Sequence, residues 1–235
     1  MQDKINLIKE TLKEDLEVSG WHKILSPFLD SEGFDNITDT LTRLVDQDRR
    51  FTPKLKDAFN AFKETKLSDV KVVIVGQDPY PQLGVADGIA FSCGNTLEMQ
   101  PTLKHMLNAV NRTVYDGVGQ SHNPDLTRWS NQGVLMLNTA LTTTVSKMGQ
   151  HFAIWKPFLA YLFDYLTFGH TGLVYIYMGK QAQEWKDVVH DMNYKFILDH
   201  PISAEYNKDS KWNCEDIFVK VQKILKDNNN YSLIW

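Results

Sequence analysis

Four short, mostly apolar runs are spaced along the chain and have the composition of buried β-strands. They lie at residues 71–75 (KVVIV), 134–137 (VLML), 173–178 (LVYIYM) and 194–198 (YKFIL). These runs do not alternate strictly between apolar and polar residues, as a strand with one wet face does. We therefore expect the strands to be covered on both sides.

The stretches between these runs are compatible with helices. The clearest has apolar residues at positions i, i+3, i+4 and i+7, a spacing that predicts a helix with one face against the core. Its apolar residues are Leu55, Ala58, Phe59 and Phe62. Further helices are expected at residues 1–20, 103–110, 158–166, 182–190 and 215–225. Asn213 is the expected N-cap of the last one.

The alternation of strands and helices predicts the fold class. Strands separated by helices form a mostly parallel sheet because each return connection crosses one face of it. We expect an α/β fold with a central, mostly parallel four-stranded sheet and helices on both faces. No repeat, low-complexity tract or Pro/Ser-rich linker divides the sequence, which predicts a single domain over residues 1–235.

Composition narrows the class of protein. The chain has 25 Lys+Arg against 29 Asp+Glu, a net charge of −4, and 43% hydrophobic residues, which is typical of a folded domain. The net negative charge argues against non-specific coating of nucleic acid but leaves room for a local basic patch. No apolar run is long enough to span a membrane, and the first residues lack the apolar core of a signal peptide. We expect a cytoplasmic monomer, or one in the host-cell cytoplasm if the source is viral, without membrane association.

Metal and cofactor sites are not expected. Two cysteines, Cys93 and Cys214, cannot build a disulfide framework, a four-thiolate zinc site or an iron–sulfur cluster. The seven histidines show neither HxH nor HxxxH spacing. The sequence therefore predicts no metal and no cofactor, and thiols that stay reduced.

Polar residues follow each predicted strand. Parallel strands end at one edge of their sheet, and ligands of such folds bind at that edge. The residues after the four strands are GQDPY (76–80), Asn138, Gly179-Lys180 and DHP (199–201). We expect an acid, an amide, a cation and an imidazole to gather at one edge.

Each of these motifs also has an ordinary interpretation. GQDPYP (76–81) is compatible with a tight turn, although Asp78 beside a rigid proline can also orient a water or stabilise a cation. Asn138 can cap a turn, or offer the donor and acceptor that match O4 and N3–H of uracil or thymine. His200 can be structural, or donate to a developing oxyanion. Phe91, in GIAFS (88–92), can be core or a stacking surface for a flat base.

Taken in order, these motifs resemble those of a known family. The matching segments are VVIVGQDPYP, GIAFS, LxxWxxQGVLMLNTALT (126–142), YMGKQAQ (177–183) and His200-Pro201. From about Trp21 to Trp235 the chain is similar to the family 1 uracil-DNA glycosylases of bacteria and mitochondria. The resemblance implies removal of uracil from single- and double-stranded DNA by base flipping, without a metal and without lyase chemistry, as the first step of base excision repair.

The resemblance also implies roles for individual residues. Asp78 resembles the acid that activates water, and His200 the neutral imidazole that binds uracil O2. Asn138 resembles the amide that reads the uracil edge, and Phe91 the ring that stacks on the base. Tyr80 resembles the side chain that excludes a 5-methyl group, and Gln77 belongs to the same loop and helps to bind O2 through its backbone.

The DNA-contacting segments depart from the family pattern. Thr102 and Lys180 stand where the family usually has serine, and Ser203 is the remaining candidate for a phosphate contact. HPIS replaces HPSPLS, so that Ile202 becomes the best match for the leucine that wedges into the duplex. Pro81 replaces a common histidine, and QHFAIWK (150–156) replaces the usual SH…GWE. DNA-mimicking inhibitor proteins are further possible partners of such an enzyme.

Three other functions compete with this hypothesis. A DNA-binding accessory protein of the same fold could lose Asp78 or Asn138, and neither is lost here. A nucleotide-binding enzyme requires GxGxxG or GxxxxGK[ST] after the first strand, and neither motif is present. A bifunctional glycosylase-lyase requires an amine in the pocket, and the matched pocket positions supply none.

Overall fold

A four-stranded parallel sheet forms the centre of the molecule. The computed structural model describes residues 2–118 and 123–235. The sheet consists of β2 (Val72–Gly76), β3 (Val134–Asn138), β5 (Val174–Met178) and β6 (Tyr194–Leu198). The strands lie in the order β3-β2-β5-β6, and every neighbouring pair is parallel. The predicted α/β class and the four predicted strands are confirmed, with boundaries that differ by one residue at most.

The strands alternate their side chains between two separate cores. Val73 and Val75 of β2 belong to one hydrophobic cluster, whereas Val72 and Ile74 belong to the other. All four side chains are fully buried. Because successive residues of a strand point to opposite faces, an uninterrupted apolar run is what a sheet covered on both sides requires.

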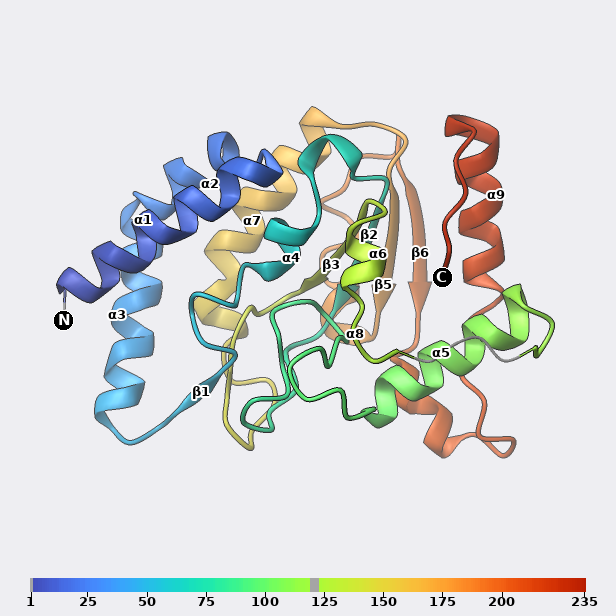
Figure 1. Ribbon diagram of the computed structural model, residues 1–235, viewed down its shortest axis with the longest axis horizontal. Coiled ribbons are helices and arrows are strands. Elements are labelled where there is room, and N and C mark those ends of the chain that lie inside the picture. Colours follow the sequence, from blue (N-terminus) through green and yellow to red (C-terminus); the bar gives the residue numbers. More distant parts are fainter. Residues whose placement is uncertain (1, 119–122) are drawn as a thin grey trace.

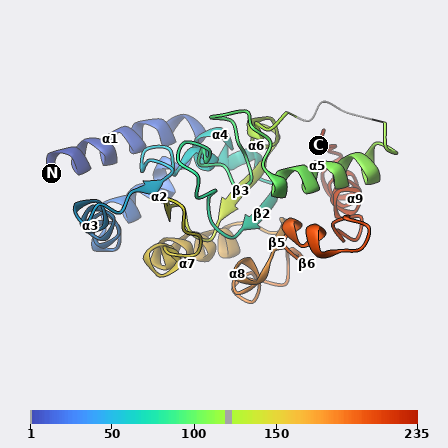
Figure 2. The same cartoon turned by 90° about the horizontal axis from the view of Figure 1, so that it is seen from below.

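Helices cover the two faces in two groups, as predicted (Figure 1). The first core lies under α1 (Gln2–Ser19), α2 (His22–Leu29), α3 (Glu32–Asp46), α4 (Asn60–Glu64) and α7 (Phe152–Gly169). Its aromatic rings meet largely edge to face, as between Phe59 and Phe158 at 5.4 Å. Figure 2 shows the strands in a row, with α7 on one side and α5 and α9 on the other.

The second core lies under α5 (Pro101–Val114), α6 (Thr127–Ser130) and α9 (Ile217–Asn229). The end of the chain belongs to it. The Trp235 ring packs edge-on against Trp129 and Phe218 at 5.2 and 4.9 Å. Short helical segments complete the structure: α8 (Lys180–Gln183), η1 (Leu67–Asp69) and η2 (Pro201–Tyr206).

Three helix predictions need correction. The four apolar residues of the Leu55–Phe62 stripe are buried as expected. Most of the stripe is not α-helical, however, because α4 starts only at Asn60. The Ala61 N–H donates to the carbonyl of Gly88 instead of continuing a helix from residue 57. In the 182–190 segment only residues up to Gln183 are α-helical, and i→i+3 turns follow. Asn213 is not the N-cap of α9: Asp216 precedes the helix, in a left-handed conformation and without a capping bond.

Several elements had no prediction. They include α2, α3 and a small antiparallel pair formed by β1 (Phe51–Thr52) and β4 (Thr143–Thr144), besides the short segments α6, η1 and η2. The β1–β4 pair lies beside the loops that follow the carboxyl ends of the sheet strands, toward the bottom of Figure 1. Within the described residues, no helix combines the length and apolarity that crossing a bilayer requires.

Candidate active site

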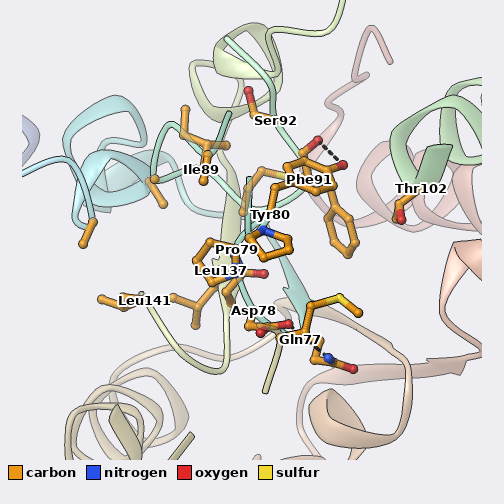
Figure 3. A pocket seen from close by; sticks show the side chains of 18 of the residues that line it. Gln77, Asp78, Pro79, Tyr80, Ile89, Phe91, Ser92, Thr102, Leu137 and Leu141 are labelled. Atoms are coloured by element: carbon orange, nitrogen blue, oxygen red, sulfur yellow. Dashed lines mark hydrogen bonds between the residues drawn. The ribbon is translucent and has the colours of Figure 1, made fainter. Parts of the chain in front are cut away.

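The predicted catalytic and base-binding residues converge on one cavity at the carboxyl edge of the sheet. The cavity has a volume of about 230 Å³ (Figure 3). All six predicted catalytic and base-binding residues line it: Gln77, Asp78, Tyr80, Phe91, Asn138 and His200. Its volume is below the ~300–1,000 Å³ typical of sites for drug-sized ligands. A cavity of this size is large enough for a single heterocyclic base.

Asp78 follows β2 and is held by three donors. Its Oδ2 accepts hydrogen bonds from the Gly149 N–H at 2.6 Å and from Thr143 Oγ1 at 3.1 Å. Its Oδ1 accepts one from Gln77 Nε2 at 3.0 Å. Burial raises the pKa of Asp78 above its ordinary value, and these three hydrogen bonds oppose that rise because they stabilise the charged form.

His200 lies two residues after β6, in surroundings that favour the neutral form of its ring. The Ile202 backbone N–H donates to Nδ1 at 3.4 Å, so the ring hydrogen is on Nε2. Burial lowers the pKa of His200 to about 4 because the charged ring would lose its hydration. Gly179 leaves room for this ring, since a Cβ on Gly179 would lie 3.1 Å from that of His200. The imidazole can therefore donate a hydrogen bond from Nε2 at neutral pH.

Asn138, the last residue of β3, is 9% exposed. Among the described residues, none hydrogen-bonds its side-chain amide. A buried amide without partners is costly, so its donor and acceptor are available to a ligand in the cavity. The register of the sheet places Asn138 directly beside Gly76 of β2.

Gly76 creates the space that Asn138 and Phe91 occupy. A Cβ at this position would lie 2.6 Å from Asn138 Oδ1 and 2.9 Å from Phe91 Cζ. Gly76 was not predicted to be a site residue, although it opens the GQDPYP motif. The close approach of two side chains explains the glycine without any demand on its φ angle.

The Phe91 ring forms one wall, and its backbone is held from several directions. Phe91 has a left-handed φ of +66°, which is uncommon for a bulky residue. Its carbonyl accepts a hydrogen bond from Tyr80 Oη at 3.1 Å, and the neighbouring Ala90 N–H donates to the Met136 carbonyl. The Phe91 and His200 rings lie 5.9 Å apart. The stacking surface is therefore fixed by the loop and not by the side chain alone.

Asp87 organises the same loop and was not predicted. Its carboxylate is 8% exposed and accepts hydrogen bonds from the Ile89 and Gly94 N–H groups and from Ser92 Oγ. These partners lie on both sides of Phe91. Burial raises the pKa of Asp87, and the hydrogen bonds oppose that rise. The nearest signal in the sequence was GIAFS, which begins one residue later.

The four predicted DNA-contact residues divide into two pairs. Thr102, at the start of α5, and Ile202, in η2, line the cavity. Lys180 and Ser203 do not line it. Lys180 is exposed at the start of α8, and the Ser203 N–H donates to the His200 carbonyl at 2.8 Å.

Comparison with known proteins places the chain in a family. The model of the "Uracil DNA glycosylase superfamily" matches residues 62–224. The chain belongs to this superfamily. A uracil-DNA glycosylase of Acinetobacter baumannii (strain ATCC 17978) is 31% identical over 236 residues, covering 100% of this chain and 95% of that protein. One from Acinetobacter baylyi is 32% identical, covering 92% of this chain and 90% of that protein.

Solved structures agree with this assignment at the level of the fold. The crystal structure of mimivirus uracil-DNA glycosylase superposes with a TM-score of 0.81 at 23% identity, covering 94% of this chain and 88% of that one. A Y322L variant of the mimivirus protein was solved in complex with UGI, with a TM-score of 0.81. The chain is a uracil-DNA glycosylase, a hydrolase that removes uracil from DNA in base excision repair.

Gly76→Ala is expected to obstruct the base site. The new Cβ must displace Asn138 or Phe91, so kcat/KM on a uracil-containing oligonucleotide should fall at least ~10-fold, with a stability cost of about 1–3 kcal/mol. Gly169→Ala is the control, because its Cβ would make only ordinary contacts at 3.7 Å. A Gly76→Ala enzyme with wild-type kcat/KM would show that the base does not bind here.

His200 is expected to stay neutral through the physiological pH range. Its folded-state pKa of about 4 lies below the ordinary 6.5, so protonation favours the unfolded chain as the pH falls. The stability contribution of the neutral ring is complete above about pH 6.5 and is lost as the pH drops through about 4. A ¹⁵N NMR titration, assigned with His200→Gln, should show the Nε2–H tautomer at pH 7. A ring that titrates above pH 6 would contradict this.

Proposed function

We propose that the cavity binds one uracil swung out of DNA, and that Asp78 and His200 divide the charges that develop as its glycosidic bond breaks. The observation that carries this proposal is the arrangement of a held carboxylate, a neutral imidazole and an unpartnered amide around one small cavity. These groups come from the ends of three different strands. Packing alone does not require such a set at one edge.

Recognition of the base rests on Asn138 and its surroundings. The free amide can pair with O4 and N3–H of uracil, whereas cytosine presents donor and acceptor in the opposite order. Phe91 would stack on the base. The Gly76 carbonyl already accepts a hydrogen bond from the Thr139 N–H at 3.1 Å, which fixes the Gly76–Gln77 peptide so that the Gln77 N–H can bind O2.

The chemistry is hydrolysis. Water adds its oxygen to C1′ of the deoxyribose as the bond from C1′ to N1 of uracil breaks, and uracil leaves with the bonding electrons. Asp78 would orient this water, take up one of its protons and stabilise the positive sugar, while His200 Nε2–H would stabilise the negative charge on uracil O2. Asp78 then returns its proton to solvent, and the released uracil anion takes one up. The two residues supply both charge-stabilising roles, which supports a metal-independent reaction. No lysine is among the described residues that line the cavity, which supports a monofunctional enzyme.

DNA would contact the rim of the cavity. Thr102 lies at the N-terminus of α5, where backbone N–H groups and the helix dipole favour a phosphate. Among the described residues Lys180 has no ion pair, so its ammonium is available to another phosphate, and Ser203 is a third candidate. Ile202 would act as the wedge that helps to repay the few kcal/mol of unstacking the base.

We also propose the finer properties expected from the sequence. The chain would act as a single domain over residues 1–235, as a monomer without membrane association, on both single- and double-stranded DNA. An inhibitor such as the UGI bound to the mimivirus protein is a possible further partner. Cys93 and Cys214 are buried and unpaired, which supports a reducing compartment such as the cytoplasm.

Asp78→Asn is expected to lower the single-turnover rate by about 10²- to 10⁴-fold, because the amide cannot take the role of a base or balance the sugar cation. Oligonucleotides with one U, T or C, treated with the enzyme in EDTA and then with alkali, measure the rate. Binding of uracil-containing DNA should survive. Asp164→Asn, an exposed carboxylate on α7, is the control. An unchanged rate in Asp78→Asn would remove the proposed role.

Tyr80→Ala is expected to admit thymine. Burial raises the pKa of Tyr80 well above its ordinary value, and its hydroxyl anchors the ring to the Phe91 carbonyl. A ring fixed in this way excludes a 5-methyl group by collision. Tyr80→Phe keeps the ring and should continue to reject thymine in the same assay. A Tyr80→Ala enzyme that is active on uracil but releases no thymine would contradict methyl exclusion.

A further inference from the structure

Three consecutive threonines form an extended segment beside the cavity. Thr142, Thr143 and Thr144 are 0%, 0% and 6% exposed, and the last two form strand β4. Successive residues of an extended chain point to opposite sides. The hydroxyls of Thr142 and Thr144 accordingly face one group, the His151 ring, while the Thr143 hydroxyl faces the Asp78 carboxylate.

His151 joins the two outer threonines. Its Nδ1 lies 2.9 Å from Thr142 Oγ1 and its Nε2 lies 3.0 Å from Thr144 Oγ1. The ring is 1% exposed, and burial lowers the pKa of His151 to about 4, with a further contribution from the positive charge of Arg49. A neutral ring has one donor and one acceptor nitrogen, so both threonine hydroxyls are satisfied together.

The His151 ring is attached to a rigid element. At the start of α7, the backbone N–H of Trp155 donates to the His151 carbonyl at 3.1 Å. Trp155 Nε1 also donates to Thr142 Oγ1 at 2.7 Å. These hydrogen bonds connect the three threonines to α7, whose buried residues belong to the first core.

The same segment supplies two of the three hydrogen bonds to Asp78. Thr143 Oγ1 contacts Asp78 Oδ2 and also lies 2.9 Å from the Lys147 carbonyl, and the Gly149 N–H contacts Asp78 Oδ2. Thr143 lies between Thr142 and Thr144, which both contact the His151 ring. Gly149 lies two residues before His151 in the sequence. Fixing the ring therefore fixes both donors.

We infer that His151 is a positioning residue, which acts through Thr143 and Gly149 to hold the Asp78 carboxylate in place for the reaction. The inference rests on the proposed role of Asp78. A positioning role differs from a purely structural one in its effect on the pKa of Asp78. Loosening the segment weakens hydrogen bonds that stabilise the charged form of Asp78, which raises the pKa of that carboxyl.

The test is the pH dependence of the single-turnover rate for His151→Phe, which keeps a ring without nitrogen. We expect a ~10-fold or greater loss of rate at neutral pH and an unchanged KM. The acid limb of the pH profile, where the rate falls because Asp78 is protonated, should move to higher pH. Thr143→Val should displace the limb in the same direction, and the double variant should show less than the product of the two losses. His151→Gln, which can both donate and accept, should recover part of the rate.

Controls separate positioning from folding. His170→Phe removes another partly buried imidazole, at the end of α7, and should leave the pH profile unchanged. If His151→Phe does not fold, Thr144→Val removes one partner of the ring and should displace the acid limb by a smaller amount. A lower melting temperature with a wild-type acid limb in either variant overturns the inference. A wild-type rate in Asp78→Asn instead overturns the proposed function itself.

Discussion

A carboxylate that must stay charged although it is largely buried is the constraint on which this structure depends. Burial alone would favour the protonated form of Asp78, and an acid in that form could neither orient water as a base nor stabilise a cation. The opposing hydrogen bonds come from three places: the adjacent Gln77, the β4 threonine and the Gly149 backbone. Much of the 139–151 loop can be understood as the means of supplying them.

The sheet topology brings the remaining groups to that carboxylate. The chain runs from β2 to β3 on one side and then to β5 and β6 on the other, so β2 lies next to the point where strand order reverses. Ligands of open α/β sheets bind at such points because the connecting loops separate there. The parallel register pairs Gly76 with Asn138, and the absence of a side chain at Gly76 allows Asn138 and Phe91 to approach each other.

The sequence predicted what depends on local pattern and on strand ends. The apolar runs marked the four strands, and the polar residues after them marked the cavity, because the carboxyl ends of parallel strands must meet. The Leu55–Phe62 stripe indicated burial correctly but not the helix, since Ala61 bonds to the distant Gly88. Thr143 and Gly149 carry no local pattern for a contact with Asp78, as both contacts exist only after the loop has folded over β2.

The two proposed catalytic groups are both largely buried, yet one is to be charged and the other neutral, and there is a physical reason for the difference. Desolvation opposes charge on both, which makes the imidazole neutral and would neutralise the acid as well. The structure adds donors around Asp78, whereas at His200 it adds one N–H that occupies Nδ1 and leaves Nε2–H to donate to a ligand in the cavity that His200 lines. A fixed negative charge and a neutral donor therefore coexist in one cavity without forming an ion pair. Such a site stabilises separated charge on a substrate, which is what cleavage of a glycosidic bond produces.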